Sequence, residues 1–232
     1  MYNYCILAPD FFEYFIATRP LLDTDPTIFC VSAWNDNGKN DLVSNDNNML
    51  YRSDFFPGLG WLLTRGIWKE YENKWPLGFW DDWIRDPKQR KGRACIRPEI
   101  SRTKTFGRVG VSQGQFYDQY LQYIKLNSVP YAFKQHSLDY LRKGKYDQIF
   151  MEDVSNSPVV NLQEVLDGKH TGRSVRVLYT VNGEFEHIAK RLGIMSDLKA
   201  GVPRMAYMGV VSIYLNNQRI YIAPKRWNGY NE

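Results

Sequence analysis

The sequence predicts a fold of the α/β or α+β class, because helical and strand patterns follow one another along the chain. Apolar and aromatic residues recur at helical spacing over residues 8–22, and Asp10 can cap the start of this helix. Residues 27–33 are rich in β-branched and apolar side chains, which is typical of a buried strand. The Asn-, Asp- and Gly-rich stretch 34–48 then predicts a long loop at the end of that strand.

The later part of the chain shows the same mixture of elements. Segments 209–215 and 218–223 flank Asn216–Asn217 and predict a β-hairpin with a two-residue turn. A change of texture near 125–131 predicts a larger region over residues 1–127 and a smaller mixed α+β region over 128–232. Further helices are predicted at 61–71, 79–85, 116–123 and 184–192, and a further strand at 174–181.

The amino-acid composition says little about the class of protein but suggests which classes of ligand it binds. Of the 232 residues, 44% are hydrophobic and 24% are charged, so the chain can bury a core and is not disordered. The formal net charge of +5 excludes none of the usual classes of ligand. Aromatic residues make up 15% of the chain, with 7 Trp and 16 Tyr. Because flat aromatic rings stack on sugars and on bases, carbohydrate and nucleic acid are the two ligand classes to consider first.

Neither a membrane span nor a signal peptide is evident in the sequence. The longest nearly uncharged apolar run, residues 55–64, is shorter than the ~18 residues that a membrane-spanning helix needs. Residues 1–10 contain neither the basic stretch nor the apolar stretch of a signal peptide. The sequence therefore predicts a cytosolic protein or one from which a targeting segment is missing.

The three cysteines, Cys5, Cys30 and Cys95, are too few and too far apart for a zinc module or a disulfide-dense scaffold. One pair and one odd thiol is a natural arrangement for this number. A bond between Cys30 and Cys95 would stabilise the fold by ~4 kcal/mol in the chain-entropy model. Three buried free thiols are the alternative.

Asp81 is the first candidate catalytic residue. It lies in Phe79–Trp83, where Trp80 and Trp83 flank an acidic pair. Indole rings can shield a carboxylate from water and so increase its basicity, and they also offer a flat face to a sugar. This pattern is typical of a general base that acts on a hydroxyl group. The alternative is a helix start in which acidic side chains interact with the helix dipole.

A basic stretch is the second candidate site. Lys and Arg crowd residues 85–108, and the loop 107–114 that follows is punctuated by glycine. Glycine lets backbone N–H groups approach a phosphate closely, and Arg adds charge-assisted hydrogen bonds, so a nucleoside diphosphate is a natural ligand. A solvated surface is the alternative. The three histidines, His136, His170 and His187, are scattered and are expected to be surface or structural residues, not ligands.

Several long motifs give the chain its family resemblance. Four of them are Cys30–Lys39, Leu50–Trp61, Phe79–Trp83 and Gly92–Arg102, and a fifth is Gly201–Arg204. In this order they resemble the N-acetylglucosaminyltransferase I family, glycosyltransferase family 13. The resemblance extends over essentially all 232 residues.

The resemblance implies a GT-A fold and an inverting transfer of GlcNAc from UDP-GlcNAc to O2 of a mannose on high-mannose N-glycans. By position in the motif, the family's catalytic base falls on Asp81. The donor loop falls on residues 108–114, and the substrate-binding residues carried over are Trp80, Arg108, Val111 and Ser112. The resemblance also implies a Cys30–Cys95 disulfide, with Cys5 unpaired, and a place on the lumenal side of the Golgi membrane. Nucleic acid is not an expected partner.

One motif departs from the family pattern. The family holds Mn²⁺ and the donor with an acidic Glu-Asp-Asp motif, whose place is occupied in this chain by Tyr2, Asn3 and Tyr4. Because Mn²⁺ prefers carboxylate ligands, these residues are not expected to bind it. Mn²⁺ is therefore the cofactor expected of the family, without its ligands in this chain. The nucleotide-binding half, a stem and a membrane anchor are expected to precede Met1.

Two other functions fit the same motifs. The first is a catalytically inactive relative that binds sugar or regulates another protein. The second is a β-1,2-GlcNAc-transferase that acts on protein O-mannose.

Overall fold

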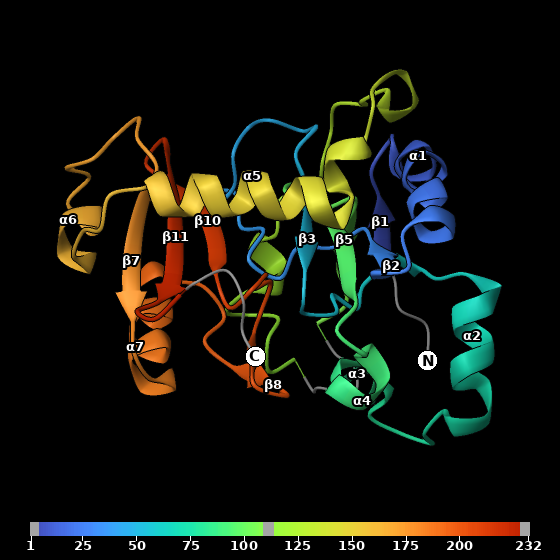
Figure 1. The fold of residues 1–232 in the computed structure, drawn as a ribbon. Coiled ribbons are helices and arrows are strands. Elements are labelled where there is room, and N and C mark those ends of the chain that lie inside the picture. The colour runs from blue at the N-terminus through green and yellow to red at the C-terminus, as the bar shows by residue number, and fades with distance from the viewer. Residues whose placement is uncertain (1–4, 109–113, 228–232) are drawn as a thin grey trace.

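The computed structural model describes residues 5–108 and 114–227. Within these ranges the chain has a mixed α/β architecture built on several small sheets, as the sequence predicts. A four-stranded and a three-stranded sheet lie side by side, and helix α5 (Lys143–Asn156) runs across both of them (Figure 1). Among the described residues, no helix is both long and apolar enough to cross a bilayer.

The four-stranded sheet has a buried parallel pair at its centre. Its strands lie in the order β3 (Leu50–Ser53), β5 (Ala94–Pro98), β2 (Ile28–Ser32) and β4 (Trp61–Leu62). The central strands β2 and β5 are parallel, and every residue in both is buried. Burial on both faces explains why β2 has no polar alternation in the sequence, and its predicted position at 27–33 is confirmed.

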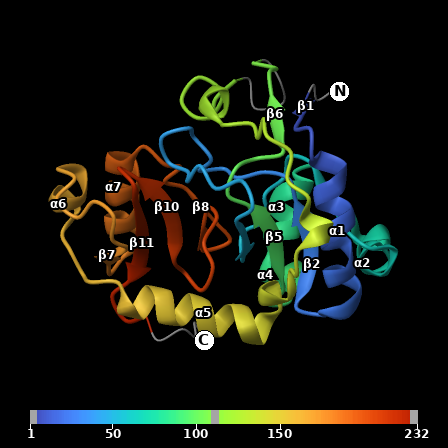
Figure 2. The ribbon, with the colours of Figure 1, turned by 90° about the horizontal axis from the view of Figure 1, so that it is seen from above.

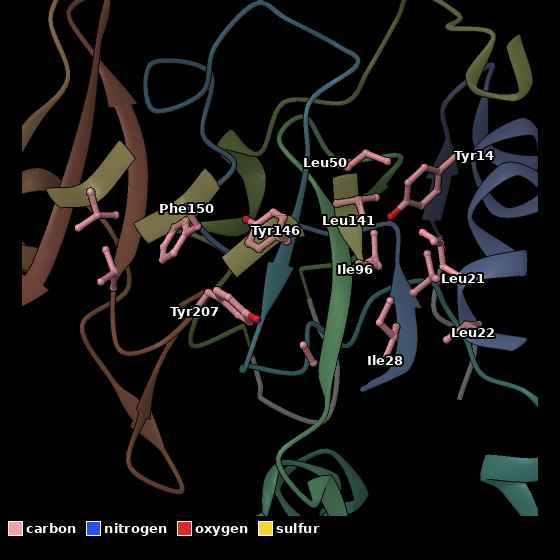
Figure 3. Close-up of a cluster of buried hydrophobic side chains, with 14 of the residues drawn as sticks. Tyr14, Leu21, Leu22, Ile28, Leu50, Ile96, Leu141, Tyr146, Phe150 and Tyr207 are labelled. Carbon is pink, nitrogen blue, oxygen red and sulfur yellow. The ribbon is translucent and has the colours of Figure 1, made fainter. Parts of the chain in front are cut away.

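Different layers cover the two faces of this sheet. Helix α1 (Phe11–Thr24) packs on one face, where its Tyr14 and Leu21 meet Ile28 and Ile96 (Figure 3). The other face carries an aromatic layer that includes Phe56 and Tyr71, packed on Cys30 and Cys95. Helix α2 (Arg65–Tyr71) supplies Tyr71 to this layer, and α3 (Trp80–Arg85) supplies Trp80 and Trp83. The aromatic layer therefore positions α3, the helix that carries Asp81.

The three-stranded sheet contains the predicted hairpin. Strands β10 (Val211–Leu215) and β11 (Gln218–Pro224) are antiparallel, and β7 (Val175–Tyr179) pairs with β11 in parallel. Side chains alternate along β11, so that Ile220 packs with helix α7 (Asn182–Leu192) and Tyr221 packs with α5. The sheet is therefore covered on both faces, as the view from above shows (Figure 2).

Helix α5 joins the two sheets through a shared core. Its Tyr146, Phe150 and Val154 are buried in the cluster that holds Ile96 of the four-stranded sheet and Tyr207 (Figure 3). Sequence reasoning assigned no element to residues 143–156. One continuous apolar cluster therefore extends beneath α5 across both sheets.

Two short two-stranded sheets and several short helices complete the fold. β1 (Cys5–Leu7) pairs with β6 (Thr103–Thr105), and β8 (Leu198–Lys199) pairs with β9 (Val202–Pro203). The remaining elements are α4 (Pro87–Arg90), α6 (Leu162–Leu166) and 3-10 turns at Glu72–Lys74, Leu121–Tyr123, Phe133–Gln135 and Asp139–Leu141.

Two predicted helices are wrong in part. The helix predicted at 61–71 begins only at Arg65, because Trp61 and Leu62 pair with β2 as an edge strand. In place of the helix predicted at 116–123, turns lead into a single 3-10 turn at Leu121–Tyr123. In the first case strand pairing overrides the local apolar spacing that suggested a helix.

Candidate functional site

The disulfide between Cys30 and Cys95 lies beneath the candidate site. The two cysteines are partners in the adjacent parallel strands β2 and β5, with their Cα atoms 4.6 Å apart. Both side chains are fully buried under the aromatic layer. The pairing implied by the resemblance is confirmed, and Cys5 is a free thiol in β1.

Helix α3 is fixed to this layer by its indoles. Trp80 stacks on Trp75, with ring centroids 5.7 Å apart, and also contacts Trp61 and Phe56. Trp83 packs against Trp75 and Tyr71. The indoles thus face the aromatic layer, and the side chain of Asp81 remains 44% exposed. The Asp81 side chain is therefore only partly withdrawn from water.

A buried arginine holds the two carboxylates of α3. Arg85 Nη1 lies 2.7 Å from Asp81 Oδ2 and 3.2 Å from Asp82 Oδ1, and its Nε donates to the Phe56 carbonyl. The Arg85 side chain is only 7% exposed. Asp81 is therefore anchored by a charge-assisted hydrogen bond from Arg85, while its side chain remains partly open to solvent.

A lysine from the β8–β9 hairpin reaches the second carboxylate. Lys199 Nζ lies 3.2 Å from Asp82 Oδ1. The hairpin turns through Ala200 and Gly201, which both have positive φ. Although Lys199 is 117 residues away from Asp82 in the chain, this turn brings it to the edge of the site.

Arg204, which directly follows the hairpin, is a second buried arginine beside the site. Its Nε and Nη2 donate to Asp197 at 2.7 and 2.8 Å, and its Nη1 lies 3.3 Å from Asp36 Oδ1. Burial opposes the charge, but the carboxylates of Asp36, Asp197 and Asp81 hold the pKa of Arg204 above its usual value. The guanidinium therefore remains positive in the wall of the site.

Two phenylalanines connect Arg204 to the rest of the site. The Arg204 guanidinium lies 5.3 Å from the ring centroid of Phe55 and 5.5 Å from that of Phe116. Arg85 lies 4.6 Å from the same Phe55 ring. Phe55 thus contacts both buried arginines, and Phe116 brings the end of the candidate donor loop to Arg204.

The candidate donor loop is described only at its two ends. Arg108 pairs with Asp118 at 2.7 Å, and both side chains are well exposed. Gly114 has φ +79, and a Cβ placed on it would lie 3.0 Å from the Arg108 carbonyl oxygen, so the two ends of the loop lie close together. Val111 and Ser112 lie outside the described residues, as do Tyr2, Asn3 and Tyr4.

The basic stretch before this loop is largely turned inward. Arg97 and Arg102 are 2% and 0% exposed, and Arg102 pairs with the buried Asp10 at 3.1 Å. Arg90 and Arg93 pair with Asp54 and Glu70. Arg97 instead lies 4.6 Å from the centroid of the Tyr51 ring. All four arginines are thus engaged by partners within the protein and do not form a solvated surface.

The described residues do not fit a divalent metal ion. Within residues 5–108 and 114–227, no group of three or more His, Cys, Asp or Glu side chains is arranged to hold one. The three histidines lie apart, and two of them have structural partners: His136 stacks on Tyr131, and His170 lies 3.5 Å from Glu164.

Comparison with known proteins gives the class of this protein. The chain matches the GNT-I family over residues 5–232, so it belongs to this family of glycosyltransferases. It is 47% identical over 214 residues to an alpha-1,3-mannosyl-glycoprotein 2-beta-N-acetylglucosaminyltransferase of Arabidopsis thaliana. The match covers 92% of this chain and 48% of that protein, so the chain spans about half the length of the relative.

Sequence reasoning found Asp81 but missed the residues that surround it. Arg85 follows Asp81 by four positions, a helical spacing that places two side chains on one face, and this signal could have found it. Arg204 ends one of the family motifs, so its motif was noticed while its place in the site was not. Asp36 lies within the Cys30–Lys39 motif in the same way. Lys199 carries no local signal, because only the tertiary fold brings it close to the site.

Proposed function

We propose that the protein transfers N-acetylglucosamine from UDP-GlcNAc to O2 of a mannose on an N-glycan, with inversion at the sugar carbon. A GT-A fold goes with this proposal, as does a place on the lumenal side of the Golgi membrane. The observation that carries it is the Asp81 carboxylate, which is anchored on one side by the buried Arg85 and open to solvent on the other. Family membership supports the donor and the acceptor.

The reaction follows from the position of this base. Asp81 accepts the proton of the mannose O2 hydroxyl as that oxygen attacks C1 of the GlcNAc unit. The bond between C1 and the β-phosphate oxygen breaks on the opposite face, and UDP leaves with the electron pair. Because attack and departure occur on opposite faces, an α-linked donor gives a β-linked product.

The other substrate contacts belong to the same proposal. Arg108, Val111 and Ser112 bind the donor from the loop, and Trp80 supports the sugar from α3. The described residues offer no ligand set for the Mn²⁺ that the family implies. The larger region over 1–127 then carries the donor loop and the acceptor side.

The decisive experiment replaces Asp81 with Asn in the longest form of the protein that its gene encodes. Asn cannot accept the proton, so kcat is expected to fall by about 10²- to 10⁴-fold, the usual contribution of a general base. Binding of UDP-GlcNAc, measured by calorimetry, is expected to remain nearly unchanged. Near-parental turnover of the Asp81→Asn variant would exclude this role.

The neighbouring carboxylate provides a matched control. Asp82 is as exposed as Asp81 and pairs with the same arginine, so Asp82→Asn makes the same chemical change one position away. It is expected to retain kcat within about tenfold of the parent. Comparing an N-glycan with a protein O-mannose acceptor separates the two acceptor classes. A parent that binds the glycan and transfers nothing would be a sugar-binding member of the family.

A further inference from the structure

The most exposed aromatic side chain next to the site is that of Phe79. Phe79 directly precedes α3, and 81% of its surface is exposed. Within residues 5–108 and 114–227, its ring packs on no other aromatic ring. Leu77, two positions earlier, is fully exposed as well. The chain thus presents apolar side chains to solvent at the point where it enters the helix of Asp81.

The backbone of Phe79 is also in an unfavourable conformation. Its φ of 51 and ψ of 38 lie in the left-handed region, which bulky residues rarely adopt. An exposed ring gains little from burial to offset this strain. Other residues with positive φ, such as Asn216 and Asn217, form a tight turn that requires it. The aromatic layer holds α3, and with it this strained residue, in place.

Phe79 is close in the chain to the candidate base. Phe79 and Asp81 are two residues apart, so their Cα atoms lie within about 7 Å of each other. The side chains of both residues are open to solvent. A hexose has both an apolar face, which an aromatic ring can bind, and hydroxyl groups, which a carboxylate can bind.

We propose that Phe79 is an acceptor-binding residue, whose ring stacks on the apolar face of a mannose unit of the acceptor. The inference rests on the proposed transfer reaction. The favourable contact is that of an aromatic face with the polarised C–H bonds of a sugar. A single stack of this kind binds the acceptor in the ground state and in the transition state alike, so its loss should appear in KM and not in kcat.

The test replaces Phe79 with Asn, which tolerates the left-handed backbone and removes the ring. We expect the KM for a mannose-terminated N-glycan to rise about tenfold, while kcat and the KM for UDP-GlcNAc stay within about twofold of the parent. The Phe79→Tyr variant keeps the ring and should recover most of the acceptor affinity. Melting of the Asn variant within about 2 °C of the parent confirms that the fold is intact.

Phe12 provides a matched control. It is 70% exposed on α1, away from α3, and Phe12→Ala should leave the acceptor KM unchanged. Saturation-transfer NMR with a free mannose-terminated oligosaccharide reports binding without turnover, and the signal should weaken in Phe79→Asn alone. An active parent whose Asn variant keeps the parental acceptor KM and NMR signal would overturn the role of Phe79 and leave the transfer reaction standing. A parent protein that shows no transferase activity would overturn the proposed function. The NMR signal would then still show whether Phe79 stacks on the sugar.

Discussion

At the scale of single residues, a prominent feature of this protein is a set of ion pairs between buried side chains. Arg52 and Arg102 are almost completely buried, and each pairs with a carboxylate that is distant in the chain: Arg52 with Asp25, and Arg102 with Asp10. A buried guanidinium that loses its partner is strongly unfavourable, so such pairs fix which segments can meet. The Arg102–Asp10 pair also explains why part of the basic stretch 85–108, which suggested a phosphate site, lies in the interior.

Asp25 should make stability depend on pH. Burial alone would raise its pKa, but hydrogen bonds from Thr27 and Lys143, together with the Arg52 charge, hold the pKa of Asp25 below its usual value. A carboxylate with a lowered pKa stabilises the folded state at neutral pH, and this contribution is lost as the pH falls below about 4. In urea unfolding, the difference between the parent and Asp25→Asn should therefore be larger at pH 7 than at pH 3.

The exposed Asp23, near the C-terminal end of α1, provides the control for this prediction. It pairs with Arg19 at the surface, and Asp23→Asn should change stability little at either pH. Equal differences between the parent and Asp25→Asn at pH 7 and pH 3 would contradict the role given to Asp25.

At the scale of elements, two hairpins turn in the same way with different residues. The β10–β11 turn uses Asn216 and Asn217, and the β8–β9 turn uses Ala200 and Gly201, all with positive φ. Asn and Gly suit this two-residue turn, whereas Ala is strained there. The strained hairpin is the one that carries Lys199 to the edge of the site.

Relieving this strain should stabilise the protein. Ala200→Asn gives the β8–β9 turn the Asn-Gly sequence that it favours, and the free energy of unfolding should rise by about 1 kcal/mol. Thermal melting should show this as an increase of about 2–4 °C. Asn216→Ala makes the opposite change in the β10–β11 turn and should lower the melting temperature by a similar amount. A lower melting temperature for Ala200→Asn would contradict this account.

At the scale of the whole molecule, two long-range connections hold the sheets in place. The Cys30–Cys95 disulfide joins neighbouring strands 65 residues apart in the chain. Helix α5 packs across both large sheets through one apolar cluster. Both connections link segments that are distant in sequence. The disulfide restricts the unfolded chain, and the packing of α5 holds the two sheets together in the folded state.

Removing the disulfide should lower stability by a predictable amount. In the chain-entropy model, a loop of this length contributes about 4 kcal/mol. The Cys30→Ala, Cys95→Ala double variant should lose a free energy of unfolding of this size in a urea titration. Cys5→Ala removes the free thiol and should change stability little. A double variant as stable as the parent would show that the cross-link does not restrict the unfolded state.

Patterns within short segments determined a large part of the fold. The period of apolar residues located α1 and α7, the β-branched run located β2, and the Asn-Asn turn located the β10–β11 hairpin. The motif around Asp81 identified the candidate base, since acidic residues between indoles need no distant partner to be noticed. These features depend on neighbours in the chain, which the sequence shows directly.

Only the tertiary structure decided what surrounds Asp81. The sequence placed Arg97 and Arg102 in a phosphate site or on the surface, and left Lys199, Arg204 and α5 without a role. Each owes its place to partners that are far away in the chain, such as Asp10 for Arg102 and Asp82 for Lys199. A charged side chain or an apolar helix face can be recognised in the sequence. The residue that it contacts depends on how the sheets pack, which the sequence does not show. The sequence by itself therefore determined the family and the candidate base, and the packing of distant segments decided the walls of the site.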